Sequence, residues 1–203
     1  MKRMSFEYML ENNRARAFVR ELMEVRPLRK ATDVGVIPNA LHIACGNGSP
    51  TSLIMKHFSL MKASAIDRDG EMIEAARANP AFAGVVDFSV GDVRALAFPD
   101  ASFDAVFDLA DLHNFTDWER GLLEMKRVLR PGGLLILEEL SRESFSHAAG
   151  RLFKALTEHP YEDMLTVDAF RGSLLRNGLE VLHFSEKNPL GLLRYLVAVA
   201  RKK

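Results

Sequence analysis

Short apolar runs alternate along the chain with longer stretches in which apolar residues recur at helical spacing. A short apolar run bounded by turn residues is typical of a buried strand, whereas the periodic stretches are typical of amphipathic helices. The runs predict strands at residues 40–44, 63–67, 85–90, 103–109, 134–137, 179–184 and 192–200. The periodic stretches predict helices at residues 12–25, from 49 onward, at 69–78, 116–129, near 145–157 and at 166–177.

Capping residues and prolines mark where several of these helices begin and end. Pro27 is expected to end the first helix. Ser49 is expected to cap the helix that Pro50 opens, because proline is favourable in a first helical turn. Thr116 and Glu119 have the spacing of a capping box, in which each side chain satisfies a backbone N–H of the other residue.

Five strands that alternate with helices, followed by a terminal strand pair, predict a doubly wound α/β fold. We expect a mostly parallel, seven-stranded Rossmann-like sheet with an antiparallel C-terminal strand and helices on both faces. Pro131, Gly132 and Gly133 are expected to form a turn that leads into the fifth strand.

Composition narrows the function classes. Lys plus Arg number 27 and Asp plus Glu number 27, and this neutral balance gives no electrostatic case for a nucleic-acid or anionic-membrane partner. The single cysteine excludes an internal disulfide, and the histidines lack metal-ligand spacing, so no metal is expected. The chain shows neither a membrane-spanning stretch nor an apolar signal core, which favours a cytoplasmic protein.

Candidate chemistry gathers where the predicted strands end. The first strand runs into a small-residue loop ending at Gly48, and the second strand ends on Asp67. A carboxylate about 20 residues beyond such a loop is typical of a nucleotide-type cofactor site, where it takes the ribose hydroxyls. Asp92 and Asp108 lie at the ends of the next two strands. Ligands bind at the carboxyl ends of strands in open α/β sheets, so these residues form the candidate site.

Four segments carry a family resemblance, in unbroken order, within roughly residues 38–140. They are residues 40–48, 63–72, 91–104 and 123–133. With these motifs the chain resembles the class I S-adenosylmethionine-dependent methyltransferases, and it is most similar to the ubiquinone and menaquinone biosynthesis C-methyltransferases. The resemblance implies S-adenosylmethionine as cofactor and a small-molecule methyl acceptor.

The resemblance also implies a division of the 203 residues, which we interpret as one methyltransferase domain. Its parts are an N-terminal helical lid at 1–30, a cofactor-binding core at 38–140, a substrate cap at 141–165 and a C-terminal helix with a strand pair at 166–203.

The glycine-rich loop is the first implied cofactor contact. Ala44, Gly46 and Gly48 would form a backbone floor under the methionine and ribose. Cys45 lies in the same loop, and we interpret it as a small buried side chain rather than a nucleophile. Two positions depart from the family, because many relatives carry an acid at the position of His42 and glycine at that of Ala44. His42 could replace the hydrogen bonds of that acid.

Later motifs imply the remaining cofactor contacts. Asp67 would take the ribose hydroxyls, and Arg68 would flank the adenine. Asp92 would receive the adenine amino group beside Val93. Asp108 would lie near the sulfonium, where a negative charge favours the cationic cofactor.

Methyl transfer needs alignment of a nucleophile with the methyl group and exclusion of water, and a general base is optional. The candidate catalytic residues are His113, Asp108 and Glu138, with Asp111 as a further candidate base or orienting group. Side chains alternate along a strand, so one of Glu138 and Glu139 is expected to face the cleft and the other solvent.

Other functions stay open at this stage. A methyltransferase-like module without catalysis, acting as a regulatory or assembly partner, is kept open by His42 and Ala44. A protein or nucleic-acid methyltransferase is disfavoured by the neutral charge and by the lack of an Asn-Pro-Pro-Tyr signature. An NAD-dependent oxidoreductase is disfavoured because the loop lacks a third glycine and the chain has no Tyr-x-x-x-Lys pair. The methyl acceptor and the oligomeric state are not specified by the sequence.

Overall fold

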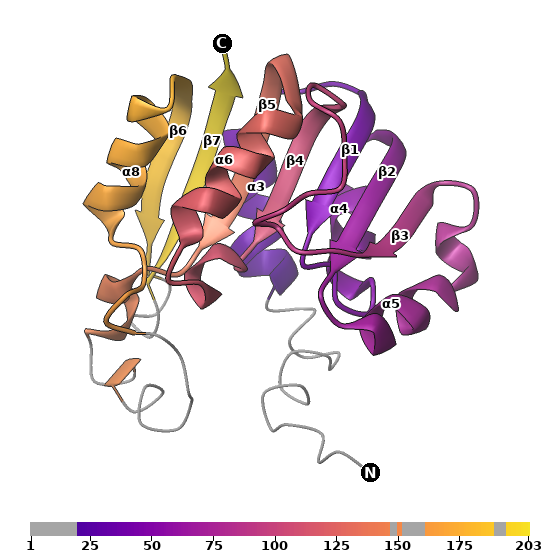
Figure 1. Ribbon diagram of the computed structural model, residues 1–203, viewed down its shortest axis with the longest axis horizontal. Helices are drawn as coiled ribbons and strands as arrows, with labels where there is room; N and C mark the ends of the chain where they lie inside the picture. The colour runs from indigo at the N-terminus through magenta and orange to yellow at the C-terminus, as the bar shows by residue number, and fades with distance from the viewer. Residues whose placement is uncertain (1–19, 147–149, 152–160, 189–193) are drawn as a thin grey trace.

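A seven-stranded sheet runs through the protein, with helices packed on both of its faces (Figure 1). The computed structural model describes residues 20–146, 150–151, 161–188 and 194–203. The strand order is β3-β2-β1-β4-β5-β7-β6. Strands β1 to β5 pair in parallel, and β7 runs antiparallel to both β5 and β6. The predicted fold class is therefore confirmed.

Each predicted strand is present, although several are longer than expected. The strands are β1 Ile37–Ile43, β2 Leu60–Asp67, β3 Val86–Val90, β4 Phe103–Leu109, β5 Leu129–Glu139, β6 Leu179–Lys187 and β7 Tyr195–Lys202. The α-helices are α3 Arg26–Ala31, α4 Ser49–His57, α5 Gly70–Arg77, α6 Trp118–Val128 and α8 Val167–Arg176. A π-helix, η1, spans Glu21–Val25, and short 3₁₀ helices are η2 Pro80–Phe82, η3 Leu112–Asn114 and η4 Arg142–Phe145.

Two of the expected helix starts are wrong. Gly48, not Ser49, is the N-cap of α4, because its left-handed backbone turns the chain into the helix. The capping box expected at Thr116 does not form, since α6 begins after Asp117 without a side-chain cap. Glu119 instead bonds Arg176 of α8 at 2.9 Å.

Prolines and glycines also behave differently from the prediction at two places. Pro27 does not end a helix but lies in the first turn of α3, which continues directly from η1 and where its missing N–H is not needed. Gly132 and Gly133 belong to β5 rather than to a turn before it. A register shift against β4 accommodates them.

Two other helices begin close to the predicted starts, since they are expected at 69–78 and 166–177 and are observed at 70–77 and 167–176. Asp69 caps α5 by accepting from Glu71 N–H, and Thr166 caps α8 by accepting from Ala169 N–H. The helix expected near 145–157 and most of the one expected at 12–25 lie outside the described residues.

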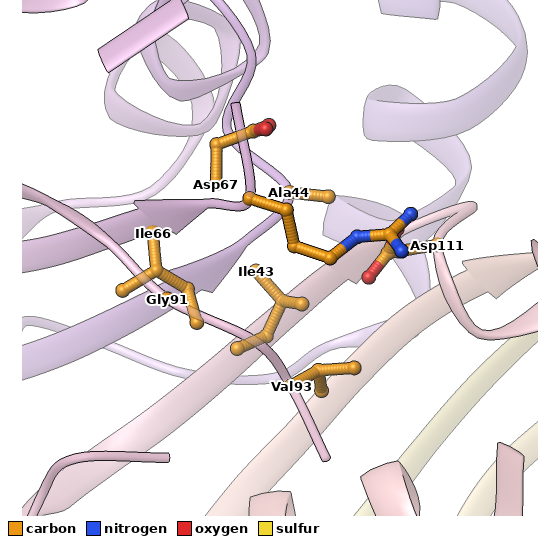
Figure 2. Close-up of a pocket in the computed structure, with 8 residues that line it drawn as sticks. Ile43, Ala44, Ile66, Asp67, Gly91, Val93 and Asp111 are labelled. Carbon is orange, nitrogen blue, oxygen red and sulfur yellow. The ribbon is translucent and has the colours of Figure 1, made fainter. Parts of the chain in front are cut away.

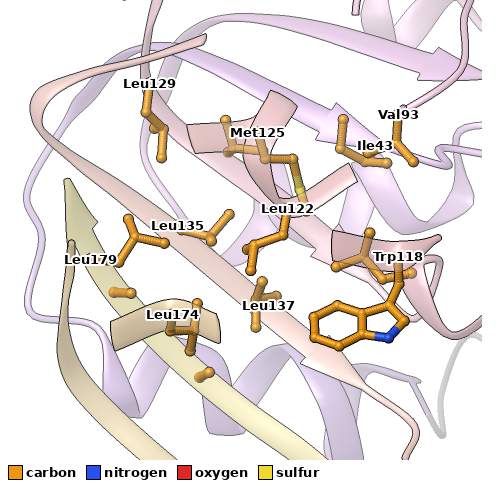
Figure 3. Packing of buried hydrophobic residues seen from close by; sticks show 14 of the residues in the cluster. Ile43, Val93, Trp118, Leu122, Met125, Leu129, Leu135, Leu137, Leu174 and Leu179 are labelled. Carbon is orange, nitrogen blue, oxygen red and sulfur yellow. The ribbon is translucent and has the colours of Figure 1, made fainter. Parts of the chain in front are cut away.

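The apolar core forms two layers, one on each face of the sheet. On one face, Trp118, Leu122 and Met125 of α6 pack over Leu135 and Leu137 of β5 (Figure 3). The other face is covered by η1, α3, α4 and α5. Burial on both faces explains why the central strands read as continuous apolar runs rather than as alternating ones.

Phe107→Ala is expected to lower the free energy of unfolding by about 3–5 kcal/mol, because it leaves a cavity in a closed core. Phe107 of β4 is fully buried, and its ring centroid lies 4.9 Å from that of Phe58 at the end of α4. Urea denaturation measures the loss. Leu175→Ala is the control, since Leu175 on α8 is 57% exposed and its truncation should change stability by at most about 0.5 kcal/mol. Equal losses in the two variants would contradict this description of the core.

Candidate functional site

A pocket opens at the carboxyl ends of the central strands, where β1 lies between β2 and β4 (Figure 2). This is the point at which the strand order reverses, and it is where ligands bind in doubly wound sheets. The pocket is lined by Ile43, Ala44, Ile66, Asp67, Arg68, Gly91, Val93 and Asp111. Its volume is about 50 Å³, much smaller than a nucleoside requires.

The loop after β1 contains small residues in left-handed conformations, and Ala44 is its residue that lines the pocket. Ala44, Gly46 and Gly48 have φ values of 52°, 52° and 85°. A Cβ at Gly48 would lie 2.7 Å from the ring of Phe82, so this position requires glycine. Ala44 lines the pocket in a left-handed conformation that an L-residue adopts at a cost of about 1 kcal/mol. Cys45 is buried, and burial raises the pKa of its thiol to about 12, which disfavours a nucleophilic role.

Asp67 joins this loop to the end of β2. Its Oδ2 accepts from Gly46 N–H at 2.8 Å, and its Oδ1 accepts from Asp69 N–H at 2.9 Å. A carboxylate can accept about four hydrogen bonds, so these two leave acceptor capacity for a ligand's hydroxyl groups. The carboxylate therefore both shapes the loop and lines the pocket.

Asp92 is held by an arginine beside the pocket. Its carboxylate accepts three side-chain hydrogen bonds from Arg94, at 2.7, 3.0 and 3.3 Å, and one from the Arg94 backbone N–H at 2.8 Å, and this pairing lowers the pKa of Asp92 to about 2. Val93 lines the pocket, whereas Asp92 does not. The guanidinium carbons of Arg68 and Arg94 each lie 4.5 Å from the ring centroid of Phe115, so two cations flank one aromatic ring.

Burial acts against the charge expected at Asp108. Asp108 is fully buried within β4, and burial together with the charges of Glu139 and Asp111 raises the pKa of Asp108 well above its ordinary value. A raised pKa disfavours the ionised carboxylate predicted for this position. Asp111 lines the pocket instead, and burial, with the charge of Glu139, raises the pKa of Asp111 to about 6.

Neither acid at the end of β5 faces solvent, so that prediction is wrong. Glu138 is 3% exposed and Glu139 is 0% exposed. They alternate to opposite faces of the sheet, but elements cover both faces. Glu139 lies near Asp108 and bonds His113 Nδ1 at 3.0 Å, and the sequence analysis gave it no role. The alternation of side chains along β5 does not indicate whether Glu138 or Glu139 would bond His113.

His42 lies outside the pocket lining, on the face of β1 that α4 covers. Its Nδ1 bonds Thr51 Oγ1 at 2.8 Å. Its Nε2 is buried without a hydrogen-bond partner in the part of the chain that the structure describes. Burial lowers the pKa of His42 to about 3, so the imidazole is neutral at neutral pH.

His42 is expected to make the fold acid-sensitive. Its folded pKa of about 3 lies below its ordinary value of 6.5, so the unfolded chain binds the extra proton between these values. Stability is therefore fully present above pH 6.5 and falls as the pH drops toward 3, by at most about 1.4 kcal/mol per pH unit.

The measurement is urea denaturation between pH 7 and pH 4, with His42→Gln compared against the unmodified protein. The variant keeps the titration of Asp108 and Asp111, so the difference between the two slopes isolates His42. Parallel pH dependences would show that His42 takes up its proton in the folded state.

Among the described residues, no cluster of three or more His, Cys, Asp or Glu side chains is arranged to hold a metal ion. None of the helices in the described ranges is long and apolar enough to cross a membrane.

Comparison with known proteins finds similarity over the central part of the chain. Residues 41–137 match the family model described as "Methyltransferase domain". A fatty-acid O-methyltransferase of Mycolicibacterium smegmatis is 33% identical over 47% of this chain and 35% of its own length. A ubiquinone/menaquinone biosynthesis C-methyltransferase of Hahella chejuensis is 36% identical over 51% of this chain and 43% of its own. The chain thus spans less than half the length of these two relatives.

A solved structure supports the fold independently. The S-adenosylmethionine-dependent methyltransferase of Mesorhizobium loti superposes with a TM-score of 0.72 over 90% of this chain and 100% of its own, at 21% identity. Residues 41–137 therefore resemble a methyltransferase domain, the chain is similar in sequence to the ubiquinone and menaquinone biosynthesis C-methyltransferases, and it has the fold of an S-adenosylmethionine-dependent methyltransferase.

Proposed function

We propose that this protein binds S-adenosylmethionine at the carboxyl ends of β1 and β2 and transfers its methyl group to a small-molecule acceptor. The observation that carries the proposal is Asp67, which lines the pocket at the switch point and is tied to the glycine loop. Both features lie within the residues that match the family. When bound, the cofactor would supply an electrophilic methyl group on a sulfonium.

The chemical types of the residues around the pocket are suited to such a cofactor. The loop backbone at Ala44, Cys45, Gly46 and Gly48 would lie against its methionine and ribose, because no large side chain intrudes there. Asp67 would accept the ribose hydroxyls with its remaining lone pairs.

The adenine end of the cofactor would contact Arg68, Asp92 and Val93. The pocket of about 50 Å³ must enlarge to admit it, and Arg68 is the lining side chain with the most freedom, since it is exposed. Arg94 places two hydrogen bonds on each oxygen of Asp92, so Asp92 would receive the amino group only after one of these bonds is released.

The negative charge expected near the sulfonium would come from Asp111 rather than from Asp108. Asp111 lines the pocket, and a pKa of about 6 leaves most of its carboxyl ionised at neutral pH. Asp108 would remain close by as a neutral carboxyl. Its role would be to shape the site rather than to supply charge.

On the side of the methyl acceptor, His113 of η3 would act as a general base. Glu138 of β5, the other candidate, lies on the opposite face of that strand from Glu139. An imidazole can take a proton from a hydroxyl or an acidic carbon near neutral pH. Relatives named for demethylmenaquinone and for fatty acids suggest small, partly apolar acceptors. Reduced naphthoquinone, simple phenols and fatty acids are therefore the first acceptors to test.

Calorimetric titration with S-adenosylmethionine and with S-adenosylhomocysteine tests the cofactor site. We expect both to bind, and Asp67→Ala to weaken binding about 10- to 150-fold, because charge-assisted hydrogen bonds to the ribose are lost. Asp87→Ala is the matched control, since Asp87 is an exposed acid on the neighbouring β3 that pairs with Lys62 at 3.1 Å. Its affinity should be unchanged.

Circular dichroism confirms that each variant is folded. If the folded, unmodified protein bound neither compound, the proposal would be wrong. If Asp67→Ala bound as tightly as the unmodified protein, the cofactor site would have to lie elsewhere.

A further inference from the structure

Glu139, the last residue of β5, is the most heavily hydrogen-bonded carboxylate near the pocket. Its Oε1 accepts from the N–H groups of Asp111 at 3.0 Å and Leu112 at 2.7 Å. Its Oε2 accepts from the N–H groups of His113 at 3.3 Å and Leu140 at 3.2 Å. The side chain is fully buried, so these bonds are not in competition with water.

The same carboxylate contacts the imidazole of His113. Glu139 Oε2 lies 3.0 Å from His113 Nδ1, and the histidine side chain is 8% exposed. An ionised carboxylate only accepts hydrogen bonds, so Nδ1 must carry the proton. The neutral imidazole then has its lone pair on Nε2, the nitrogen that can take up a further proton.

Asp108 makes this arrangement possible without placing two negative charges together. It lies beside Glu139 and is fully buried, and burial raises its pKa well above the ordinary value. Asp108 has no donor aligned with its Oδ2 in the described part of the chain, whereas four backbone N–H groups donate to Glu139. The charge therefore resides on Glu139 and the proton on Asp108.

We propose that Glu139 is a positioning residue for the methyl-transfer reaction: it fixes His113 in the Nδ1–H tautomer and holds the 3₁₀ turn η3 in place, so that Nε2 serves as the base. This inference rests on the proposed function for its catalytic meaning. Its structural content, the tautomer of His113, stands on the contacts of Glu139 alone.

Glu138 provides the internal comparison. It is the adjacent residue, has the same side chain and is also buried, but it lies on the opposite face of β5. Its charge acts on Tyr195 of β7, where burial is the largest cause of a pKa raised to about 12 and Glu138 adds to it. A role in orienting His113 should therefore belong to Glu139 and not to Glu138.

Nuclear magnetic resonance of ¹⁵N-histidine-labelled protein tests the tautomer without any ligand. In the unmodified protein His113, identified by its loss in His113→Gln, should show a protonated Nδ1 and an unprotonated Nε2. The opposite tautomer would overturn the proposal. This measurement needs no Glu139 variant and remains decisive if such a variant does not fold.

Glu139→Gln should invert the tautomer. The shorter backbone contacts are on Oε1, so the amide oxygen should take that position and the amide NH₂ should face Nδ1. A donor there requires an unprotonated Nδ1, which moves the proton to Nε2. Glu138→Gln should leave the His113 signals unchanged. An unchanged tautomer in folded Glu139→Gln, or an equal change in Glu138→Gln, would refute the role of Glu139.

Kinetics with S-adenosylmethionine and reduced naphthoquinone test the catalytic part. Glu139→Gln and His113→Gln should each lower kcat about 100-fold or more, while KM for S-adenosylmethionine stays within about twofold. The double variant should be no slower than either single one, because both remove the same base. If the losses in kcat were additive, or if KM alone rose, Glu139 would act only through the fold.

The two proposals fail in different ways. Absence of cofactor binding in the folded protein would defeat the proposed methyltransferase function but leave the measured tautomer of His113 intact. An Nε2–H tautomer alongside normal cofactor binding would defeat the role of Glu139 and leave the cofactor site standing.

Discussion

Burial of the central strands on both faces is the constraint on which the rest of the structure depends. Once helices cover β1, β4 and β5 from both sides, a polar side chain on these strands must find its partner inside the protein. His42 bonds Thr51 and its pKa is lowered, which favours the neutral imidazole, and the pKa of Asp108 is raised, which favours its protonated form. Glu139 keeps its charge because backbone N–H groups surround it. The same constraint leaves the carboxyl ends of the strands as the place where polar chemistry can reach a ligand.

The two halves of the site are stabilised in the same way. In each half, a carboxylate at a strand end accepts hydrogen bonds from backbone N–H groups of the neighbouring loop. Asp67 at the end of β2 fixes the loop after β1 through Gly46. Glu139 at the end of β5 fixes the turn after β4 through Leu112. In each case the acid belongs to a strand adjacent to the one whose loop it holds. Parallel pairing places such ends side by side, so each loop is fixed by its neighbouring strand rather than by its own sequence.

The sequence predicted the features that local pattern determines. The strands follow from apolar runs, and Asp67 follows from its position after a small-residue loop. Partners distant in sequence account for most failures. The Thr116 capping box does not form, and Glu119 pairs with Arg176, 57 residues away. The local sequence also did not show that surrounding elements bury Asp108 and so raise its pKa. Alternation placed Glu138 and Glu139 on opposite faces but could not tell which face holds His113.

The arginines beside the pocket differ in how firmly they are held, and this difference bears on how the pocket can enlarge. Both lie 4.5 Å from the ring of Phe115. Arg94 also bonds Asp92 and Asp117, so moving it would break two ion pairs. Arg68 is exposed and lines the pocket, and its attraction to Asp111 is weaker than a direct ion pair. Displacing Arg68 from Phe115 costs about 0.5–1 kcal/mol for an exposed cation–π contact, which the burial of an adenine ring would readily offset. The pocket therefore opens most easily at Arg68, on the side where the adenine is expected, while Arg94 keeps Asp92 in place.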